Sequence, residues 1–322
     1  MADAVLEVEG LRVRFGDVEA VRGAGLAVAP GETHGLVGES GCGKSLTALA
    51  VMGLLPHGAV QVAGSVRFRG EELVPGRRLR ALRGDRIGMV FQEPMTSLNP
   101  AYTVGSQMTE VFRRHRGGGW WGGARAAAVD RAAEMLGRVG IAGPGRRLGQ
   151  FPHELSGGLR QRVMIAMSLM CGPELLIADE PTTALDVTVQ AGILRLLAGL
   201  QAEMGLALLL ITHDLGVVAR VADQMSVMYA GQVVESGPVP QVFARPSHPY
   251  TRGLLASVPV PGATARGAPL GSIPGTVPRI GLGFVGCAFR DRCALAQPAC
   301  AQDVPWQQAA PGHGYLCVLP PQ

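Results

Sequence analysis

Short apolar runs separated by turns make up the hydrophobic pattern of the chain. The N-terminal part alternates strand-like runs with turns, in LEVEGLRVRFG, GAGLAVAPGE and THGLVG. Two later runs, LLIAD at 175–179 and ALLLIT at 207–212, are almost continuously apolar. Runs of this kind suit strands of a parallel sheet covered on both faces. With the helical pattern VQAGILRLLAGLQAEMG between them, they predict an α/β arrangement.

The division of the chain follows changes in this pattern. Residues 93–162 lack strand signals and include GGGWWGG, and after about residue 240 proline and glycine become frequent. We therefore predict a core formed by residues 1–92 and 163–240, a helical subdomain at 93–162, and a loop-rich extension at 241–322.

Composition bears on location and partners. The chain is 47% hydrophobic and 17% charged, yet its most apolar stretches, 205–211 and 163–170, fall short of the roughly 20 residues that cross a bilayer. The N-terminal MADAVLEVEG has acidic residues and no long apolar region, so we predict no signal peptide and a reducing, cytosolic compartment without structural disulfides. A net charge of +4 without a basic tract predicts no nucleic-acid partner.

A glycine-rich segment, GESGCGKS, lies between a predicted strand and a predicted helix. This context is the one that the pattern G-x-x-x-x-G-K-[ST] requires, and it argues against a chance glycine-rich turn. The glycines let backbone N–H groups face phosphates, Lys44 would neutralise the β- and γ-phosphates, and the Ser45 hydroxyl would ligate Mg²⁺. The predicted nucleotide-binding residues here are Gly38, Glu39, Ser40, Gly41, Cys42, Gly43, Lys44 and Ser45.

The apolar run LLIADE ends in two carboxylates. Asp179 would reach Mg²⁺ through water, and Glu180 would polarise the attacking water as general base. Alone, such an ending more often marks exposed turn residues. The phosphate loop upstream favours the catalytic interpretation.

A third motif, LSGGLRQR, opens a helix with Ser156, Gly157 and Gly158. Its backbone N–H groups form a second anion-binding device, although the serine by itself could be an ordinary helix cap. One nucleotide does not need two such devices from one subunit. We therefore predict a dimer in which each LSGG segment closes on the other subunit's γ-phosphate.

With these motifs the sequence resembles the ATP-binding subunit of an ABC transporter over most of its length. The resemblance implies an α/β fold with a RecA-like P-loop core, an inserted helical subdomain and a C-terminal extension. Gln92 in VFQEP resembles the Q-loop glutamine that senses the γ-phosphate and Mg²⁺, and His213 in ITHD resembles the switch histidine. The other residues that the resemblance assigns to the nucleotide are Phe15, which would stack on adenine, Gln161 in the signature segment, and Asp186 of the D-loop.

Three longer stretches, FQEPMTSLNPAYTVGSQMTE, LDVTVQAGIL and PSHPYTRGLL, resemble the oligopeptide/dipeptide/nickel import subfamily. Members of that subfamily carry a C-terminal extension after the His-Pro-Tyr element, as this chain does. The GGGWWGG segment departs from the family pattern, and the sequence assigns it no function.

Four of the six cysteines lie in the C-terminal segment: Cys287, Cys293, Cys300 and Cys317. Four thiolates in a loop-rich segment suggest a metal that folds it. Zinc pairs of the form C-x₂₋₄-C are absent, whereas Cys₄ ligation suits an iron–sulfur cluster, and some dipeptide-importer ATPases of the resembled subfamily have such a tail with a [4Fe–4S] cluster. We favour the cluster over zinc or unmetallated thiols. His313 is either a spare ligand or, our preference, a surface histidine, and Cys42 and Cys171 are interpreted as buried packing residues.

The resemblance implies an ATPase that couples ATP and Mg²⁺ to import of di- or oligopeptides, peripheral on the cytoplasmic face of the inner membrane. Its partners would be a second, distinct ATPase subunit, two permease subunits and, indirectly, a substrate-binding protein. Nickel or glutathione import remains an alternative because cargo specificity lies in other subunits. Three other classes fit the sequence less well. An ABC-type ATPase of translation would carry two cassettes, and one of DNA repair would have a long coiled coil between Gly43 and Ser156, whereas this chain has one set of motifs and a short separation. The intact motifs also oppose a non-enzymatic binding module with a degenerate nucleotide site.

Overall fold

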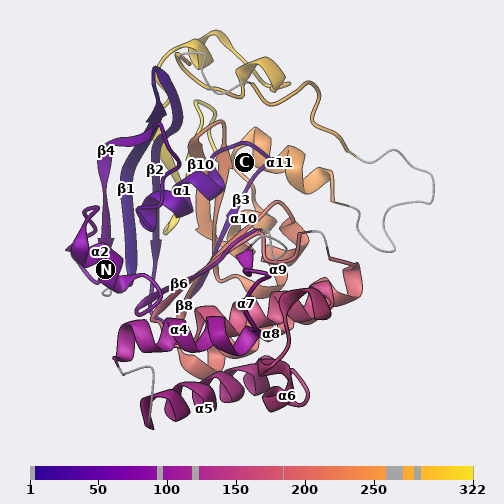
Figure 1. Cartoon of the computed structure of the whole chain (residues 1–322). Helices are drawn as coiled ribbons and strands as arrows, with labels where there is room; N and C mark the ends of the chain where they lie inside the picture. Colours follow the sequence, from indigo (N-terminus) through magenta and orange to yellow (C-terminus); the bar gives the residue numbers. More distant parts are fainter. Residues whose placement is uncertain are drawn as a thin grey trace. The chain divides into compact units, whose positions relative to one another are not determined.

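The computed structural model describes residues 4–92, 97–117, 123–183, 185–258, 271–278 and 284–321. The chain divides into two compact units. Unit 1 comprises Met1–Val5, Ala29–Gly31 and Leu73–Leu209, and unit 2 comprises Leu6–Val28, Glu32–Glu72 and Leu210–Gln322. Figure 1 labels many of the elements of both units, and each unit is described by itself below. Most of the GGGWWGG segment, residues 118–122, lies outside the described residues.

Unit 1 combines a parallel strand pair with a group of helices. Strand β6 (Ile87–Val90) pairs in parallel with β7 (Leu175–Asp179), all of whose residues are buried. The helices of this unit are α2 (Arg77–Leu82), α4 (Val104–Arg116), α5 (Gly123–Arg138), α6 (Pro144–Leu148), the 3₁₀ turn η1 (Pro152–Glu154), α7 (Gly157–Ser168) and α8 (Val187–Met204). The described residues between 97 and 162 form helices and turns without a strand, and the domain boundaries at 93 and 162 stay a prediction.

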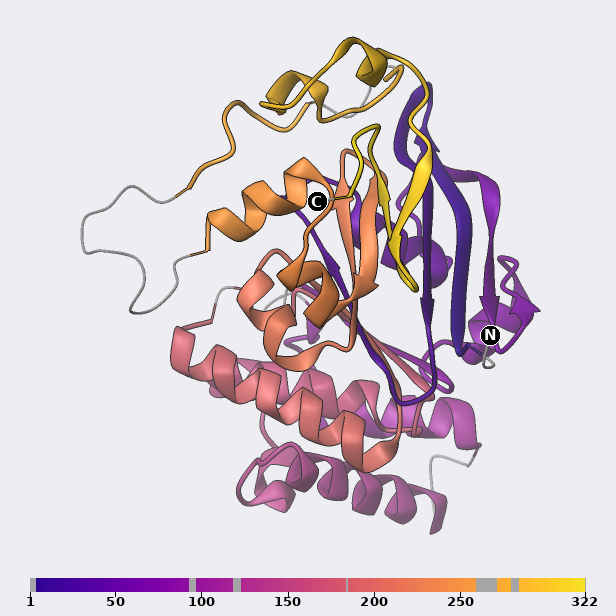
Figure 2. The same cartoon turned by 180° about the vertical axis from the view of Figure 1, so that it is seen from behind.

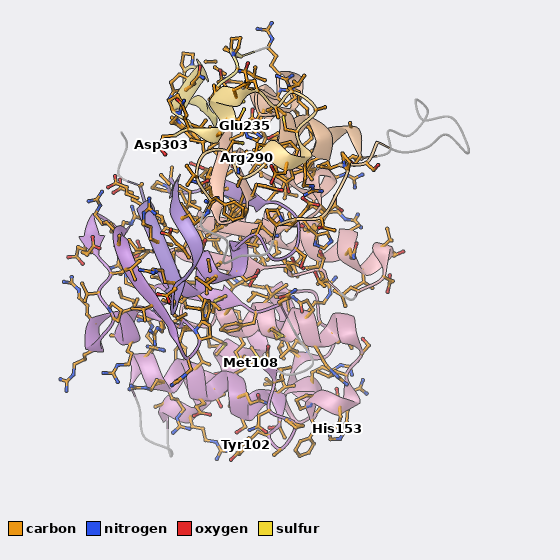
Figure 3. All side chains as sticks on the ribbon, turned by 90° about the horizontal axis from the view of Figure 1, so that it is seen from above. Tyr102, Met108, His153, Glu235, Arg290 and Asp303 are labelled. Carbon is orange, nitrogen blue, oxygen red and sulfur yellow. The ribbon has the colours of Figure 1, made fainter. Side chains whose placement is uncertain are left out.

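The helices of unit 1 pack through small and apolar side chains. On α5, Ala128, Ala132 and Leu136 follow each other at intervals of four residues and are buried, so they form one helix face. Helix α4 presents Val104 and Met108 in the same way, and it contacts α5, α6 and α7. Figure 3 labels Met108 on this part of the chain, together with Tyr102 and His153. Small side chains such as these alanines let neighbouring helices pack closely.

Unit 2 contains an antiparallel sheet near the N-terminus and a mixed group of strands. In the antiparallel sheet, β1 (Leu6–Phe15) lies between β2 (Val18–Val28) and β4 (Ala59–Phe68), and the two-residue β5 (Glu71–Glu72) adds to β4. In the second group, β3 (Thr33–Val37) pairs in parallel with β9 (Gln224–Tyr229), and β10 (Gln232–Pro238) pairs with β9 antiparallel. Strand β8 (Ala207–Thr212) begins in unit 1 and ends in unit 2. The predicted apolar strands at 175–179 and 207–212 are therefore confirmed.

The remaining elements of unit 2 are short helices and a C-terminal hairpin. The helices are α1 (Lys44–Val51), α9 (Leu215–Val221), α10 (Val239–Ala244), α11 (Pro249–Ala256) and the 3₁₀ turns η2 (Arg290–Arg292) and η3 (Pro298–Ala301). Strand β11 (Trp306–Ala310) pairs with β12 (His313–Leu316), which in turn pairs with β10 (Figure 2). Among the described residues, no helix has the length and apolar character that a bilayer crossing requires.

The C-terminal extension packs into unit 2 more closely than its proline- and glycine-rich sequence predicts. Glu235 on β10 is fully buried and accepts hydrogen bonds from the backbone N–H groups of Ser247 (2.7 Å) and His248 (2.9 Å). Its carboxylate also lies 2.7 Å from Nε2 of His313, a residue that is buried on β12. The expectation of a surface histidine at 313 is therefore wrong, because a buried carboxylate from a distant strand holds its ring. Figure 3 labels Glu235 on this part of unit 2, together with Arg290 and Asp303.

Candidate active site

The glycine-rich loop of unit 2 has a backbone that only glycine fits. It connects the fully buried strand β3 to helix α1, in the predicted order. A Cβ atom at Gly38 would lie 2.1 Å from the carbonyl oxygen of Met228, and one at Gly43 would lie 3.1 Å from that of Ala20, while both residues have positive φ. A side chain at Gly38 would collide with neighbouring backbone, and one at Gly43 would be crowded on a backbone with a φ of 104°, so both positions favour glycine.

Lys44 lies inside the curve of this loop and is only 4% exposed. Its Nζ donates hydrogen bonds to the carbonyl oxygens of Gly38 (2.7 Å) and Glu39 (3.0 Å). The Cys42 thiol, 3.7 Å away, has its pKa raised by burial despite the nearby Lys44 charge, so it is a neutral packing residue here. Together with the N-terminus of α1, this ammonium group forms a preformed cationic site that fits phosphate.

The carboxylates at the end of β7 belong to unit 1. Asp179 is 4% exposed at the end of the strand. Glu180, the next residue, has a positive φ of 44°, which is unusual for a residue other than glycine and redirects the chain. Its Oε2 accepts hydrogen bonds from Oγ1 of Thr183 (2.7 Å) and from Nε2 of Gln92 (3.2 Å).

This geometry brings two of the predicted residues together. Gln92 and Glu180 meet although they are far apart in the sequence, and the carboxylate is fixed from two sides. Thr183 was missed by sequence reasoning. The only signal for it is its position three residues after Glu180, in a turn that its backbone N–H closes onto the Glu180 carbonyl oxygen.

The LSGG segment, also in unit 1, begins helix α7. Ser156 is the N-cap, and its Oγ accepts a hydrogen bond from the N–H of Leu159 at 3.4 Å. A Cβ at Gly158 would lie 2.9 Å from Cγ1 of Val189, so glycine here lets the starts of α7 and α8 approach closely. Asp186 caps α8 by accepting from the N–H of Val189 at 3.0 Å. The helix starts that carry the predicted signature and D-loop residues therefore lie close together, at Gly158 and Val189.

Gln161 lies on the inner side of α7 and is almost fully buried. Its Oε1 finds no hydrogen-bond partner among the described residues. A buried amide oxygen without a partner is costly by about 1–3 kcal/mol, so this atom marks a place where a further donor would stabilise unit 1.

The remaining predicted residues belong to unit 2. Phe15 ends β1 and is half-buried, paired with Val18 and Ala59 in the sheet. His213 follows β8 directly, and Asp214 caps helix α9 through hydrogen bonds from the N–H groups of Gly216 (2.7 Å) and Val217 (3.3 Å). The expected order of strand, histidine and helix is therefore present.

The C-terminal cysteines influence each other electrostatically. The pKa of Cys287 is raised to about 11, first by burial and further by the neighbouring thiols of Cys300, Cys317 and Cys293. The backbone N–H of Cys287 donates to the carbonyl oxygen of Cys300 at 2.8 Å. Within the described ranges, however, no group of three or more His, Cys, Asp or Glu side chains could hold a metal ion. The prediction of an iron–sulfur cluster, like that of zinc, is therefore not supported by this arrangement.

The P-loop in unit 2 and the Gln92–Glu180 and LSGG arrangements in unit 1 define an ATP-binding cassette of the ATP-hydrolysing kind. Residues 21–183 match the model of the family described as ABC transporter, and residues 234–300 match that described as oligopeptide/dipeptide transporter, C-terminal region. The chain belongs to the ABC transporter ATP-binding proteins, and it carries the C-terminal region of the oligopeptide/dipeptide branch.

Curated relatives match along the whole chain. A probable peptide ABC transporter ATP-binding protein of Sinorhizobium fredii is 50% identical, with 98% of this chain and 95% of the relative covered. The oligopeptide transport ATP-binding protein of Salmonella typhimurium is 47% identical, and the dipeptide transport ATP-binding protein of Bacillus subtilis is 46% identical. Both matches cover 99% of this chain, with 95% of the Salmonella protein and 96% of the Bacillus protein covered.

Solved structures with the same fold are ABC cassettes. One is a Clostridium perfringens subunit described as part of an ABC transporter complex, with a TM-score of 0.64 and 30% identity over 75% of this chain and 91% of that chain. Another is an ATP-binding cassette described as a dimer bound to ADP and Pi in a post-hydrolysis state, with a TM-score of 0.63 and 26% identity over 73% of this chain and 98% of that chain. The predicted α/β cassette fold is therefore confirmed.

Proposed function

We propose that this chain is an ATP-hydrolysing subunit of an importer for di- and oligopeptides. The observation that carries the proposal is the similarity, over nearly the full length of both chains, to relatives named for peptide, dipeptide and oligopeptide transport. The match of residues 234–300 to the oligopeptide/dipeptide C-terminal region supports the same branch.

In this proposal the P-loop residues Gly38–Ser45 hold the ATP phosphates and Phe15 stacks on the adenine. Lys44 would exchange its two carbonyl partners for β- and γ-phosphate oxygens, which are stronger acceptors. The Ser45 hydroxyl and the Asp179 carboxylate are hard oxygen ligands that suit Mg²⁺, the latter through water. When bound, Mg²⁺ would neutralise charge on the transferred phosphoryl group.

Glu180 is the proposed general base. Hydrogen bonds from Thr183 and Gln92 fix its carboxylate, and a fixed base abstracts a proton from water more effectively than a mobile one. Gln92 would in addition sense the γ-phosphate and Mg²⁺, and His213 would contact the γ-phosphate and hold the geometry of the attacking water.

The LSGG residues Ser156, Gly157 and Gly158, with Gln161 and Asp186, are proposed to act on the nucleotide of a second ATPase subunit. ATP that bridges two such subunits favours the closed dimer because it binds that state more tightly than the open one. The partner subunit is proposed to be a distinct but related ATPase. Two permease subunits would recruit the pair to the cytoplasmic face of the inner membrane and receive cargo from a binding protein.

For the C-terminal cysteines, the hypothesis from the sequence stays a proposal: Cys287, Cys293, Cys300 and Cys317 would hold a [4Fe–4S] cluster. It draws on the mutual influence of the four thiols, since a four-iron cluster spaces its ligands more widely than one metal ion does. Purification without oxygen, followed by assays of iron, acid-labile sulfide and zinc, tests it. About four irons and four sulfides per chain, lost in Cys293→Ser, would support the cluster, and no metal would end the hypothesis.

The test of the proposed function is cargo uptake in cells that lack this chain. Uptake of a labelled dipeptide and a labelled tetrapeptide should fall on deletion and return with the intact chain, but not with Glu180→Gln. Loss of nickel or glutathione uptake with peptide uptake unchanged would replace the cargo assignment. Unchanged uptake of all four would remove the transport assignment and leave the ATPase.

A further inference from the structure

Glu39, the second residue of the P-loop, is held by other residues of unit 2 through all of its polar groups. Its backbone N–H donates a hydrogen bond to the hydroxyl of Tyr250 at 3.0 Å. Its carbonyl oxygen accepts from Lys44 at 3.0 Å. Its carboxylate accepts two hydrogen bonds from Arg292, with NH1 to Oε2 at 2.8 Å and NH2 to Oε1 at 3.2 Å. Two of the three holders, Tyr250 and Arg292, come from the C-terminal extension.

Arg292 itself is fixed by its surroundings. Its Nε donates to the carbonyl oxygen of Pro274 at 2.8 Å, and NH2 also approaches the carbonyl oxygen of Ile273 at 3.3 Å. The side chain is 7% exposed, against 30% for Glu39. Burial lowers the pKa of Arg292, but hydrogen bonds to Glu39 and to the Tyr229 hydroxyl raise it further, so the net direction is upward. A two-bond guanidinium–carboxylate pair in a largely buried place is among the stronger and more directional polar contacts.

Packing of aromatic rings fixes the same region. The rings of Tyr229, Tyr250 and Phe289 lie within 4.6 to 5.4 Å of each other, and all three side chains are buried. Arg292 follows Phe289 by one 3₁₀ turn and directly precedes Cys293. The C-terminal extension therefore presents Arg292 to the P-loop from a rigid base.

We propose that Arg292 is a positioning residue that neutralises Glu39 and holds the P-loop in its phosphate-binding shape, so that the C-terminal extension sets the affinity for ATP. The inference rests on the proposed binding of ATP phosphates by Gly38–Ser45. Without Arg292, the negative charge of Glu39 would stand uncompensated in a loop that must receive the negative charges of ATP. Without Arg292, the Glu39 carboxylate would also have lost these two hydrogen bonds at the moment when Lys44 leaves the Gly38 and Glu39 carbonyl oxygens for phosphate.

The test is equilibrium binding of a fluorescent ATP analogue, with Mg²⁺, to the purified chain. Arg292→Ala should raise the Kd about tenfold, an ordinary size for coupling between two parts of a protein. The Kd of Arg292→Lys should lie between those of the unchanged chain and Arg292→Ala, because a lysine keeps the charge but cannot make the paired hydrogen bonds. The matched control is Arg290→Ala in the same 3₁₀ turn. Arg290 donates hydrogen bonds to Asp291 and to the Val285 carbonyl oxygen, and not to Glu39. The Kd of this variant should therefore equal that of the unchanged chain.

Steady-state hydrolysis separates positioning from a structural defect. Arg292→Ala should raise KM for ATP about tenfold and leave kcat within about twofold, because the contact acts on binding and not on the base. In a double-mutant cycle, Glu39→Gln combined with Arg292→Ala should bind ATP no worse than Glu39→Gln alone, since the charge that Arg292 compensates is then absent.

The outcomes distinguish an error in the proposed phosphate site from an error in the proposed role of Arg292. If Lys44→Ala leaves the Kd unchanged, the proposed phosphate site is wrong. If Lys44→Ala abolishes binding while Arg292→Ala binds like Arg290→Ala, or if the effects of the Glu39 and Arg292 changes simply add, the phosphate site stands and the role of Arg292 is overturned. A lowered kcat with unchanged KM in Arg292→Ala also overturns it.

Discussion

Nε2 of Gln92 donates a hydrogen bond of 3.2 Å to Oε2 of Glu180, across 88 residues of sequence. The same carboxylate oxygen accepts from Thr183 at 2.7 Å. The contact joins the residue assigned to γ-phosphate sensing with the residue assigned to water activation. A movement of the Gln92 side chain would therefore change the hydrogen bonding of Glu180 at Oε2.

Glu180→Gln should reduce ATP hydrolysis by at least about 100-fold, because an amide cannot accept a proton from water as a carboxylate does. The amide oxygen can still accept from Thr183, so the fold and ATP binding should persist. Phosphate release measures the first effect, and ATP-dependent dimerisation by size-exclusion chromatography measures the second. Hydrolysis at the rate of the unchanged chain would show that Glu180 is not the base.

Thr183→Val should lower kcat about tenfold with little change in KM, because the hydroxyl would position Glu180, the proposed base, without binding the nucleotide. The shape of the side chain is kept, and only the donor to Glu180 is lost. Thr182→Val is the control, since Thr182 contributes its backbone carbonyl oxygen to a hydrogen bond with Gln190. Equal kcat in both variants would remove Thr183 from the positioning of Glu180.

Gly38→Ala should destabilise unit 2 by about 2 kcal/mol or more and abolish ATP binding, because the new Cβ would meet the Met228 carbonyl oxygen at 2.1 Å. Gly41→Ala is the matched control in the same loop. Gly41 also has positive φ, but its Cβ would meet nothing within 4 Å, so only backbone strain of about 1 kcal/mol is expected. Thermal unfolding and nucleotide binding of both variants test the distinction, and equal losses would contradict it.

His248 should make the stability of unit 2 depend on pH. Burial, with a smaller contribution from the charge of Arg252, lowers its pKa from 6.5 to about 3. The unfolded state then binds more protons than the folded state between these values, so stability is full above about pH 6.5 and falls as the pH drops toward 3. The slope for this one group is about 1.4 kcal/mol per pH unit.

His248→Asn removes the titrating group and can keep an acceptor for the Tyr250 N–H, which His248 Nδ1 accepts at 3.1 Å. The difference in unfolding free energy between the unchanged chain and the variant should therefore shrink by about 2 kcal/mol from pH 7 to pH 5. Denaturant unfolding at both pH values provides the measurement. A difference that stays constant would mean that the pKa of His248 is the same in the folded and the unfolded state.

Local sequence was sufficient for much of the cassette. The run THGLVG, the glycine loop and the helix after it are consecutive, so strand, P-loop and α1 follow from nearest neighbours in the chain. The same holds for the apolar strands β7 and β8 and for the helical region between 97 and 162. The positions of Glu180 at the end of a buried strand and of Ser156 at a helix start were likewise predicted from the pattern alone.

What the sequence by itself determined is therefore the set of elements and the chemistry at their ends, because hydrophobic period, caps and glycine loops act over a few residues. Only the tertiary structure decided which distant groups meet. It buries His313 against Glu235, joins Gln92 to Glu180, and brings Arg292 to Glu39 across 253 residues. Such contacts depend on how segments far apart in the chain pair and pack within each unit, and no local pattern encodes that pairing.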